Sequence, residues 1–155
     1  MRYVSNHHPG SRWALLTVAS PTAAPLVLFG LRAASVAGYS GTDPTLDGPQ
    51  LARLVARHEA RYVVLGGAYA SRGGNLATKA VLRACRLVPP ASWHGPPPQS
   101  VYTLVLFDCA GRERQLSDVA QATPTLSPIR SPSTLRPRVS LTPVSAPRSI
   151  ARRIS

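Results

Sequence analysis

Apolar residues in the first 116 positions follow two alternating patterns, one typical of buried strands and one typical of helices. Short apolar runs bounded by Gly or Pro predict strands at residues 12–19, 34–39, 61–67, 86–88 and 101–108. Between them, capped segments and apolar spacings of three and four predict helices at residues 22–29, 49–59 and 76–85. The same spacing places His58 and Leu76 on inward helix faces. The alternation predicts a small α/β domain over residues 1–116, a three-layer sandwich with a mostly parallel sheet and helices on both faces.

Residues 13–31 form an uncharged run about as long as a membrane span. Pro21 and Pro25 interrupt it, and two prolines four positions apart disfavour one continuous helix. The run therefore predicts a buried strand followed by a short helix that ends at Gly30. A true membrane span is the alternative.

Residues 117–155 consist mainly of Ser, Pro, Thr, Arg and Val, without an aromatic side chain. Such a segment cannot bury enough apolar surface to offset the entropy of ordering, so we expect a disordered basic tail. The chain carries 18 basic and 6 acidic residues, a net charge of +12. In the folded part the arginines are scattered, which favours a solvated basic surface. Binding of nucleic acid or another anionic polymer through the tail is the alternative.

The loop after the second predicted strand, Tyr39 to Pro44, is a candidate ligand site. In open α/β sheets, loops at the carboxyl ends of strands line the ligand crevice. Asp43 and Ser40 are suited to hydrogen bonds with sugar hydroxyls, and Tyr39 is suited to stacking on a sugar ring. The alternative is a structural turn in which Asp43 caps and Gly41 takes a positive φ.

A second candidate is the glycine-rich loop from Gly66 to Asn75, which connects a predicted strand to a helix. Backbone N–H groups of such loops bind phosphate together with a helix N-terminus, and Arg72 adds charge. Asn75 is the predicted helix cap. No complete phosphate-binding motif is present, so a flexible surface loop is the alternative.

The sequence offers no catalytic or metal-binding constellation. No nucleophile can be matched with a base, and we predict no catalytic residue. His7 and His8 are adjacent but His58 and His94 are distant from them, so no metal role is predicted for the histidines, and the two cysteines have no further ligands at zinc spacing. No metal or cofactor is predicted.

Several segments together resemble one protein family. The motifs are the strand region YVSNHHPGSRWALLTVAS, then TAAPLVLFG, AGYSGTDP, QLARLVARHEARYVVLGG and a final LFDC. This set, within residues 3–110, resembles the C-terminal domain of mannosyltransferase-like integral-membrane glycosyltransferases. These proteins are similar to the protein O-mannosyltransferases and the aminoarabinose lipid A transferases.

The resemblance implies an accessory domain, because the family's catalytic acidic residues lie in the membrane part. It implies a polyprenyl-phosphate-linked sugar as donor, and that sugar, a glycan acceptor and the membrane part as partners. The expected location is the extracytoplasmic face of the membrane within a full transferase, or the cytoplasm for a chain expressed alone. A non-functional gene fragment is a further alternative.

The extracytoplasmic placement that the resemblance implies also bears on the two cysteines. Cys85 ends a predicted helix and Cys109 ends a predicted strand, so the two can form one bridge between neighbouring elements. With the resemblance, we expect this disulfide. Two reduced thiols in the cytosol are the alternative.

Overall fold

A computed structural model describes residues 2–7 and 10–121, and most of the predicted tail therefore lies outside the described residues. Within that described part, five strands form: β1 (Leu15–Thr17), β2 (Ala33–Ser35), β3 (Tyr62–Leu65), β4 (Arg86–Leu87) and β5 (Val105–Asp108). The helices there are α1 (Arg2–His7), α2 (Ser20–Leu28), α3 (Gly48–Ala56), α4 (Leu76–Ala84), α5 (Pro90–Trp93) and α6 (Glu113–Gln121), with a short 3₁₀ helix η1 (Ala70–Arg72).

The strands form one mixed sheet in the order β2-β1-β3-β5-β4. β1 pairs in parallel with β2 and β3, whereas β5 runs antiparallel to both β3 and β4. Four strands therefore share one direction, which confirms the mostly parallel α/β sheet. We call the edge where β1, β2 and β3 end the carboxyl edge, and the opposite one the amino edge. Because β5 is reversed, it begins at the carboxyl edge.

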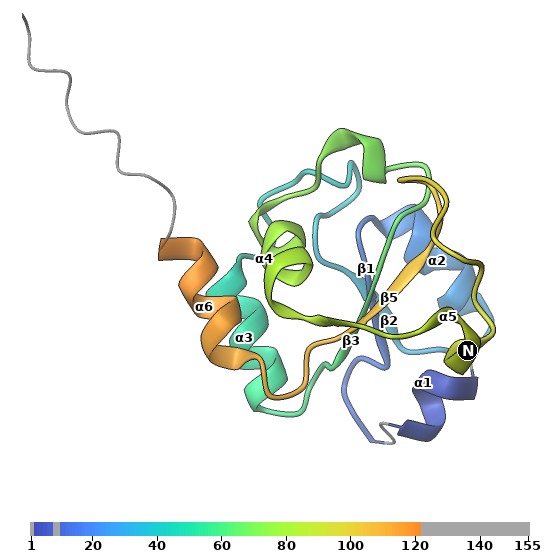
Figure 1. Cartoon of the computed structure of the whole chain (residues 1–155), viewed down its shortest axis with the longest axis horizontal. Coiled ribbons are helices and arrows are strands. Elements are labelled where there is room, and N and C mark those ends of the chain that lie inside the picture. The colour runs from blue at the N-terminus through green and yellow to red at the C-terminus, as the bar shows by residue number, and fades with distance from the viewer. Residues whose placement is uncertain (1, 8–9, 122–155) are drawn as a thin grey trace, which may run out of the picture. The chain divides into compact units, whose positions relative to one another are not determined.

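Helices cover both faces of the sheet, as predicted (Figure 1). On one face, buried residues of α3, α4 and α6 pack against strand residues such as Leu16, Val63 and Phe107. On the other, α1, α2 and α5 pack against a cluster that includes Leu15 and Tyr62. Successive strand residues thus point to opposite layers, as the pleat of a strand requires. The result is the expected three-layer sandwich.

The uncharged run at residues 13–31 contains β1 and α2, as predicted. The strand is buried at every position, and α2 begins with Pro21 in its first turn. Within the described ranges, no helix is both long enough and apolar enough to cross a bilayer.

The helix α6 extends past the predicted domain boundary at residue 116, through to Gln121. Leu116 is fully buried and Val119 packs against the same core cluster. Gly48 in α3 allows a close approach to α6, since a Cβ there would lie 2.4 Å from the Leu116 carbonyl oxygen. Residues 117–121 therefore belong to the folded domain rather than to the tail.

Two inward positions predicted from helical spacing are wrong. The helix α3 ends at Ala56, and His58 follows it in a left-handed conformation (φ 56°) on the surface. Leu76 is the first residue of α4 and is about half exposed, because a side chain in the first turn points back beyond the core. Burial in α4 begins instead with the next residue, Ala77.

A bidentate ion pair ties β3 to β5 at the amino edge. Arg61 donates from Nε to Asp108 Oδ1 at 2.9 Å and from Nη2 to Oδ2 at 2.7 Å. Burial acts to raise the pKa of Asp108, but the hydrogen bonds from Arg61 and the Ala110 N–H together with the charges of Arg61 and Arg86 outweigh it and hold the pKa below its ordinary value. Next to Arg61, burial raises the pKa of Tyr62 to about 12. We interpret this ion pair as structural rather than as part of a ligand site, because the charges of Arg61 and Asp108 neutralise each other.

Candidate functional site

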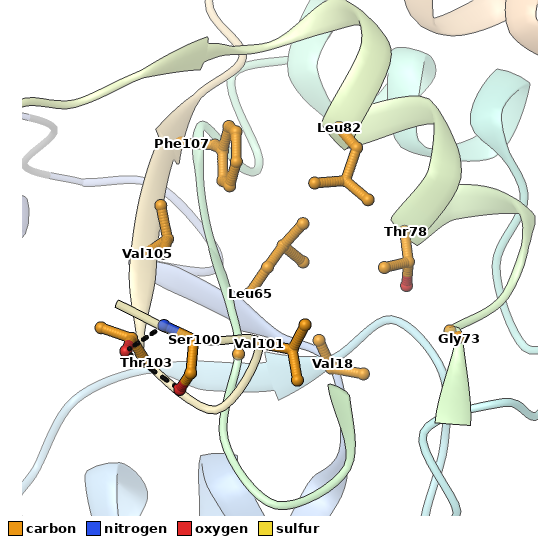
Figure 2. A pocket seen from close by; sticks show the side chains of 12 residues that line it. Val18, Leu65, Gly73, Thr78, Leu82, Ser100, Val101, Thr103, Val105 and Phe107 are labelled. Atoms are coloured by element: carbon orange, nitrogen blue, oxygen red, sulfur yellow. Dashed lines mark hydrogen bonds between the residues drawn. The ribbon is translucent and has the colours of Figure 1, made fainter. Parts of the chain in front are cut away.

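An apolar cavity of about 250 Å³ opens at the carboxyl edge, between α4 and the sheet (Figure 2). Strand ends supply one wall, with Val18 after β1, Leu65 of β3, and Val105 and Phe107 of β5. The remaining walls come from α4 and from two loops, through Thr78, Leu82, Gly66, Gly73, Gly74, Ser100, Val101 and Thr103. The cavity lies where an open α/β sheet places its ligand crevice.

The first predicted site loop, residues 39–44, is held in shape by Asp43. Its Oδ2 accepts hydrogen bonds from the backbone N–H of Tyr39 at 2.9 Å and of Ser40 at 3.2 Å, and its Oδ1 accepts the Ser40 hydroxyl. The Ser40 hydroxyl is the main cause that keeps the pKa of Asp43 below its ordinary value. Gly38 turns the chain with φ +64°, and a Cβ at this position would collide with the Asp43 side chain. Asp43 thus closes the turn as an ionised acceptor.

Asn75 fastens this loop to the start of α4. The side chain is almost fully buried, and its Nδ2 donates to the carbonyl oxygens of Val36 at 2.7 Å, Asp43 at 3.0 Å and Leu46 at 3.0 Å. Its Oδ1 accepts the Thr78 backbone N–H at 3.0 Å, which is the predicted helix cap. The Asn75 amide is therefore occupied within the protein.

Arg72 connects the glycine-rich loop to the first loop. Its Nη1 donates to the Ser40 carbonyl oxygen at 3.1 Å, and its guanidinium lies 4.9 Å from the centre of the Tyr69 ring. Arg72 directly precedes Gly73 and Gly74, which line the cavity, whereas its guanidinium is held against the loop at Ser40.

Two loops line the cavity, a third (residues 39–44) contacts the glycine-rich loop, and each of the three carries a tyrosine. Tyr39 lies on the first loop and is 73% exposed, and Tyr102, between two lining residues, is 58% exposed. Tyr69 lies on the glycine-rich loop, where its Cβ is 3.0 Å from the position of a Cβ on Gly41. We call the cavity together with these three tyrosines and Arg72 the carboxyl-edge crevice.

The structure brings the predicted site residues Tyr39, Ser40, Asp43, Arg72 and Asn75 together on adjoining loops, but none of them is among the residues that line the cavity. Ligand binding by them stays a prediction. Sequence reasoning did not identify Tyr69, Tyr102 or the apolar lining. The loop that holds Tyr102 reaches the crevice because its backbone pairs with the glycine-rich loop, where the Gly67 N–H donates to the Tyr102 carbonyl at 2.9 Å. The signal in the sequence that could have identified Tyr102 was a tyrosine at the start of the apolar run at residues 101–108.

Cys85 and Cys109 form a disulfide, with their Cα atoms 4.5 Å apart. Cys85 ends α4, and Cys109 follows β5 directly and is fully buried. Because β5 ends at the amino edge, the bridge lies at the opposite end of the strands from the crevice. Across residues 2–7 and 10–121, no three His, Cys, Asp or Glu side chains gather where they could hold a metal ion.

Comparison with known proteins assigns the chain to a family. A family model described as "Putative mannosyltransferase YkcB-like, C-terminal" matches residues 1–83, more than half of the chain. The protein "Putative mannosyltransferase YkcB" of Bacillus subtilis (strain 168) is 32% identical over 76 residues, which is 48% of this chain and 10% of that protein. No solved structure matches significantly. The chain therefore belongs to the family of YkcB-like mannosyltransferase C-terminal domains.

Proposed function

We propose that this domain is a non-catalytic, sugar-binding part of a membrane glycosyltransferase that uses a polyprenyl-phosphate-linked sugar as donor. The observation that carries the proposal is the carboxyl-edge crevice, an apolar cavity with three tyrosines and one arginine on the loops that line or adjoin it. The chain spans about a tenth of the relative that it matches, so the catalytic groups are expected in the remainder of such a protein.

The chemistry of the crevice suits a sugar ring. A pyranose has apolar C–H faces that pack on aromatic rings, and Tyr39 and Tyr102 are both exposed on loops that adjoin or line the cavity. A cavity of about 150 Å³ accepts a benzene molecule, so 250 Å³ leaves room for a group of about the size of one sugar ring or one prenyl unit. Arg72, which precedes the lining residues Gly73 and Gly74, would supply a hydrogen-bonding cation for a phosphate.

Removing the two exposed rings tests this proposal. In Tyr39→Ala/Tyr102→Ala, we expect affinity for a mannosyl ligand to fall about ten-fold, because each aromatic contact contributes about 0.5–1.5 kcal/mol. Titration calorimetry of the full chain with mannosyl phosphate and with a manno-oligosaccharide measures this. Phe29→Ala removes an exposed aromatic ring at the amino edge and serves as the control. Equal affinity for wild type and the double variant would exclude the crevice as the sugar site.

The same titration distinguishes the two sources of a sugar. A lipid-linked donor combines the sugar with a phosphate and a prenyl chain, so a short prenyl mannosyl phosphate is expected to bind more tightly than mannosyl phosphate alone. A glycan acceptor instead predicts affinity that rises with oligosaccharide length. Val101→Asp, which places a charge at the apolar lining, is expected to weaken the prenyl ligand selectively.

We also propose that the domain faces an oxidising compartment, on the extracytoplasmic side of the membrane. Disulfides persist in such compartments and are rare in the cytosol. The bridge between Cys85 and Cys109 supports this placement. Accessibility of an exposed residue to a membrane-impermeant label in intact cells tests it, and labelling only after lysis would contradict it.

A further inference from the structure

The end of α2 exposes the most prominent apolar surface of the described residues. Leu28 is 86% exposed and Phe29 is 90% exposed, and Val27 before them is 51% exposed. These three neighbours, which we call the α2 tip, lie at the amino edge because α2 starts where β1 ends and runs back along the sheet. Contiguous exposed apolar side chains of this size mark an interaction surface.

The composition of α2 separates it from an ordinary surface helix. Its sequence, SPTAAPLVL, contains no charged residue, and its polar residues are confined to the first turn. Ala23 and Leu26 face the core, so the apolar side chains on the rest of its last turn have no core to cover. A helix that is apolar on all sides normally contacts a further apolar environment besides the core of its own domain.

Two arginines lie near the α2 tip. Arg2 of α1 lines, together with Phe29, a groove of about 490 Å³ between α1 and the end of α2, and Arg32 follows just beyond the tip. The sequence has no acidic residue before Asp43. The carboxylates elsewhere at the amino edge are engaged, with Glu59 paired to Arg12 and Arg57, and Asp108 paired to Arg61.

We propose that the α2 tip docks this domain onto an anionic lipid bilayer. Leu28 and Phe29 would enter the boundary between head groups and acyl chains, which interfacial helices reach with their apolar residues. Arg2 and Arg32 would lie at the level of the lipid phosphates, where each basic side chain adds attraction to an anionic surface. Charge complementarity favours lipid over a second copy of this chain, since two such tips would bring arginines against arginines.

Docking by the α2 tip also orients the domain. The tip lies at the amino edge and the crevice lies at the carboxyl edge, so the crevice would open away from the bilayer. In this orientation the crevice is placed for a glycan acceptor rather than for a donor whose prenyl chain lies in the bilayer.

Vesicle co-sedimentation of the full chain tests the proposal, with phosphatidylglycerol-containing vesicles compared with pure phosphatidylcholine. Leu28→Ser/Phe29→Ser removes the apolar tip without changing the net charge. Leu76→Ser/Leu87→Ser removes two exposed leucines at other places and is the matched control, because all four side chains are exposed hydrophobics. Basic residues beyond position 121 are identical in every variant, so their attraction to the vesicles cancels from the comparison.

We expect the affinity of the tip variant for anionic vesicles to fall at least about ten-fold, while the control binds like wild type. In Phe29→Trp, brominated acyl chains are expected to quench fluorescence beyond the level set by Trp13 and Trp93. Equal binding by the tip variant and the control would overturn the proposal. So would a tip variant that loses only self-association, because a second copy would then be the occupant.

Discussion

Replacing Asn75 by alanine is expected to lower the free energy of unfolding by about 3 kcal/mol. About 1 kcal/mol of this is the lost helix cap, because Thr78 loses its side-chain acceptor. The larger part comes from the carbonyl oxygens of Val36, Asp43 and Leu46, which share the two amide hydrogens of Asn75 and would lose their donor. Urea unfolding of the variant and wild type measures the difference.

Asn75→Asp separates the two roles of this residue. Aspartate caps a helix about as well as asparagine, so a role limited to capping predicts almost no loss. Aspartate has no amide hydrogens and would place a carboxylate against three carbonyl oxygens, so we expect a loss at least as large as that of Asn75→Ala. Asp47→Ala, which removes the cap of α3 alone, is the control and is expected to cost about 1 kcal/mol. A stable Asn75→Asp variant would show that the loop does not depend on this amide.

Reducing the disulfide between Cys85 and Cys109 is expected to destabilise the domain by about 3 kcal/mol. The two cysteines lie 24 residues apart in the sequence. The bridge restricts the unfolded chain by joining the end of α4 to the residue after β5. For a domain of this size, that loss corresponds to a fall in Tm of about 10 °C. Thermal unfolding with and without a reducing agent measures it.

The double variant Cys85→Ala/Cys109→Ala provides the control for this experiment. Its Tm is expected to lie near that of the reduced wild type and to be unaffected by the reducing agent. The bridge is at the amino edge, far along the strands from the carboxyl-edge crevice, so reduced protein that remains folded is expected to keep its sugar affinity. An unchanged Tm on complete reduction would contradict the stabilising role.

The location of the candidate site could be predicted from sequence because it follows from strand direction. The loops after β1, β2 and β3 must meet at one edge when these strands are parallel, which brings Ser40, Asp43, Arg72 and Asn75 into reach of one another. The caps at Asp47 and Asn75 could be predicted as well, since each precedes a helix whose first N–H groups need an acceptor.

The lining of the cavity could not be predicted, because it depends on the reversed strand β5. Its direction brings Ser100, Val101 and Thr103 next to the loop at Gly66, about 35 positions earlier in the chain. Hydrophobic patterning gives no signal for such long-range pairing or its direction. The helix α6 was missed for a different reason. Leu116 and Val119 are its main apolar contacts with the core, too few to mark a periodic pattern.

The shared role of Asn75 was also beyond sequence reasoning. Its position before a helix predicts the cap, but the carbonyl oxygens that it binds lie 29 to 39 positions earlier. The same bonds change the interpretation of the site. Asn75 holds the loops next to the cavity together, while Tyr39, Tyr102 and Arg72 are the side chains that we propose contact a ligand.

The most direct test of the central proposal is to map where a mannosyl ligand binds on the protein. We would record amide chemical shifts of the full chain, and of a chain ending at Gln121 so that α6 stays intact, during titration with mannosyl phosphate. Sugar binding at the crevice predicts shifts that cluster in residues 39–43, 66–75 and 100–103 and persist in the shortened chain. Shifts confined to residues beyond 121, or lost with them, would contradict it and would support binding of anions by the basic tail.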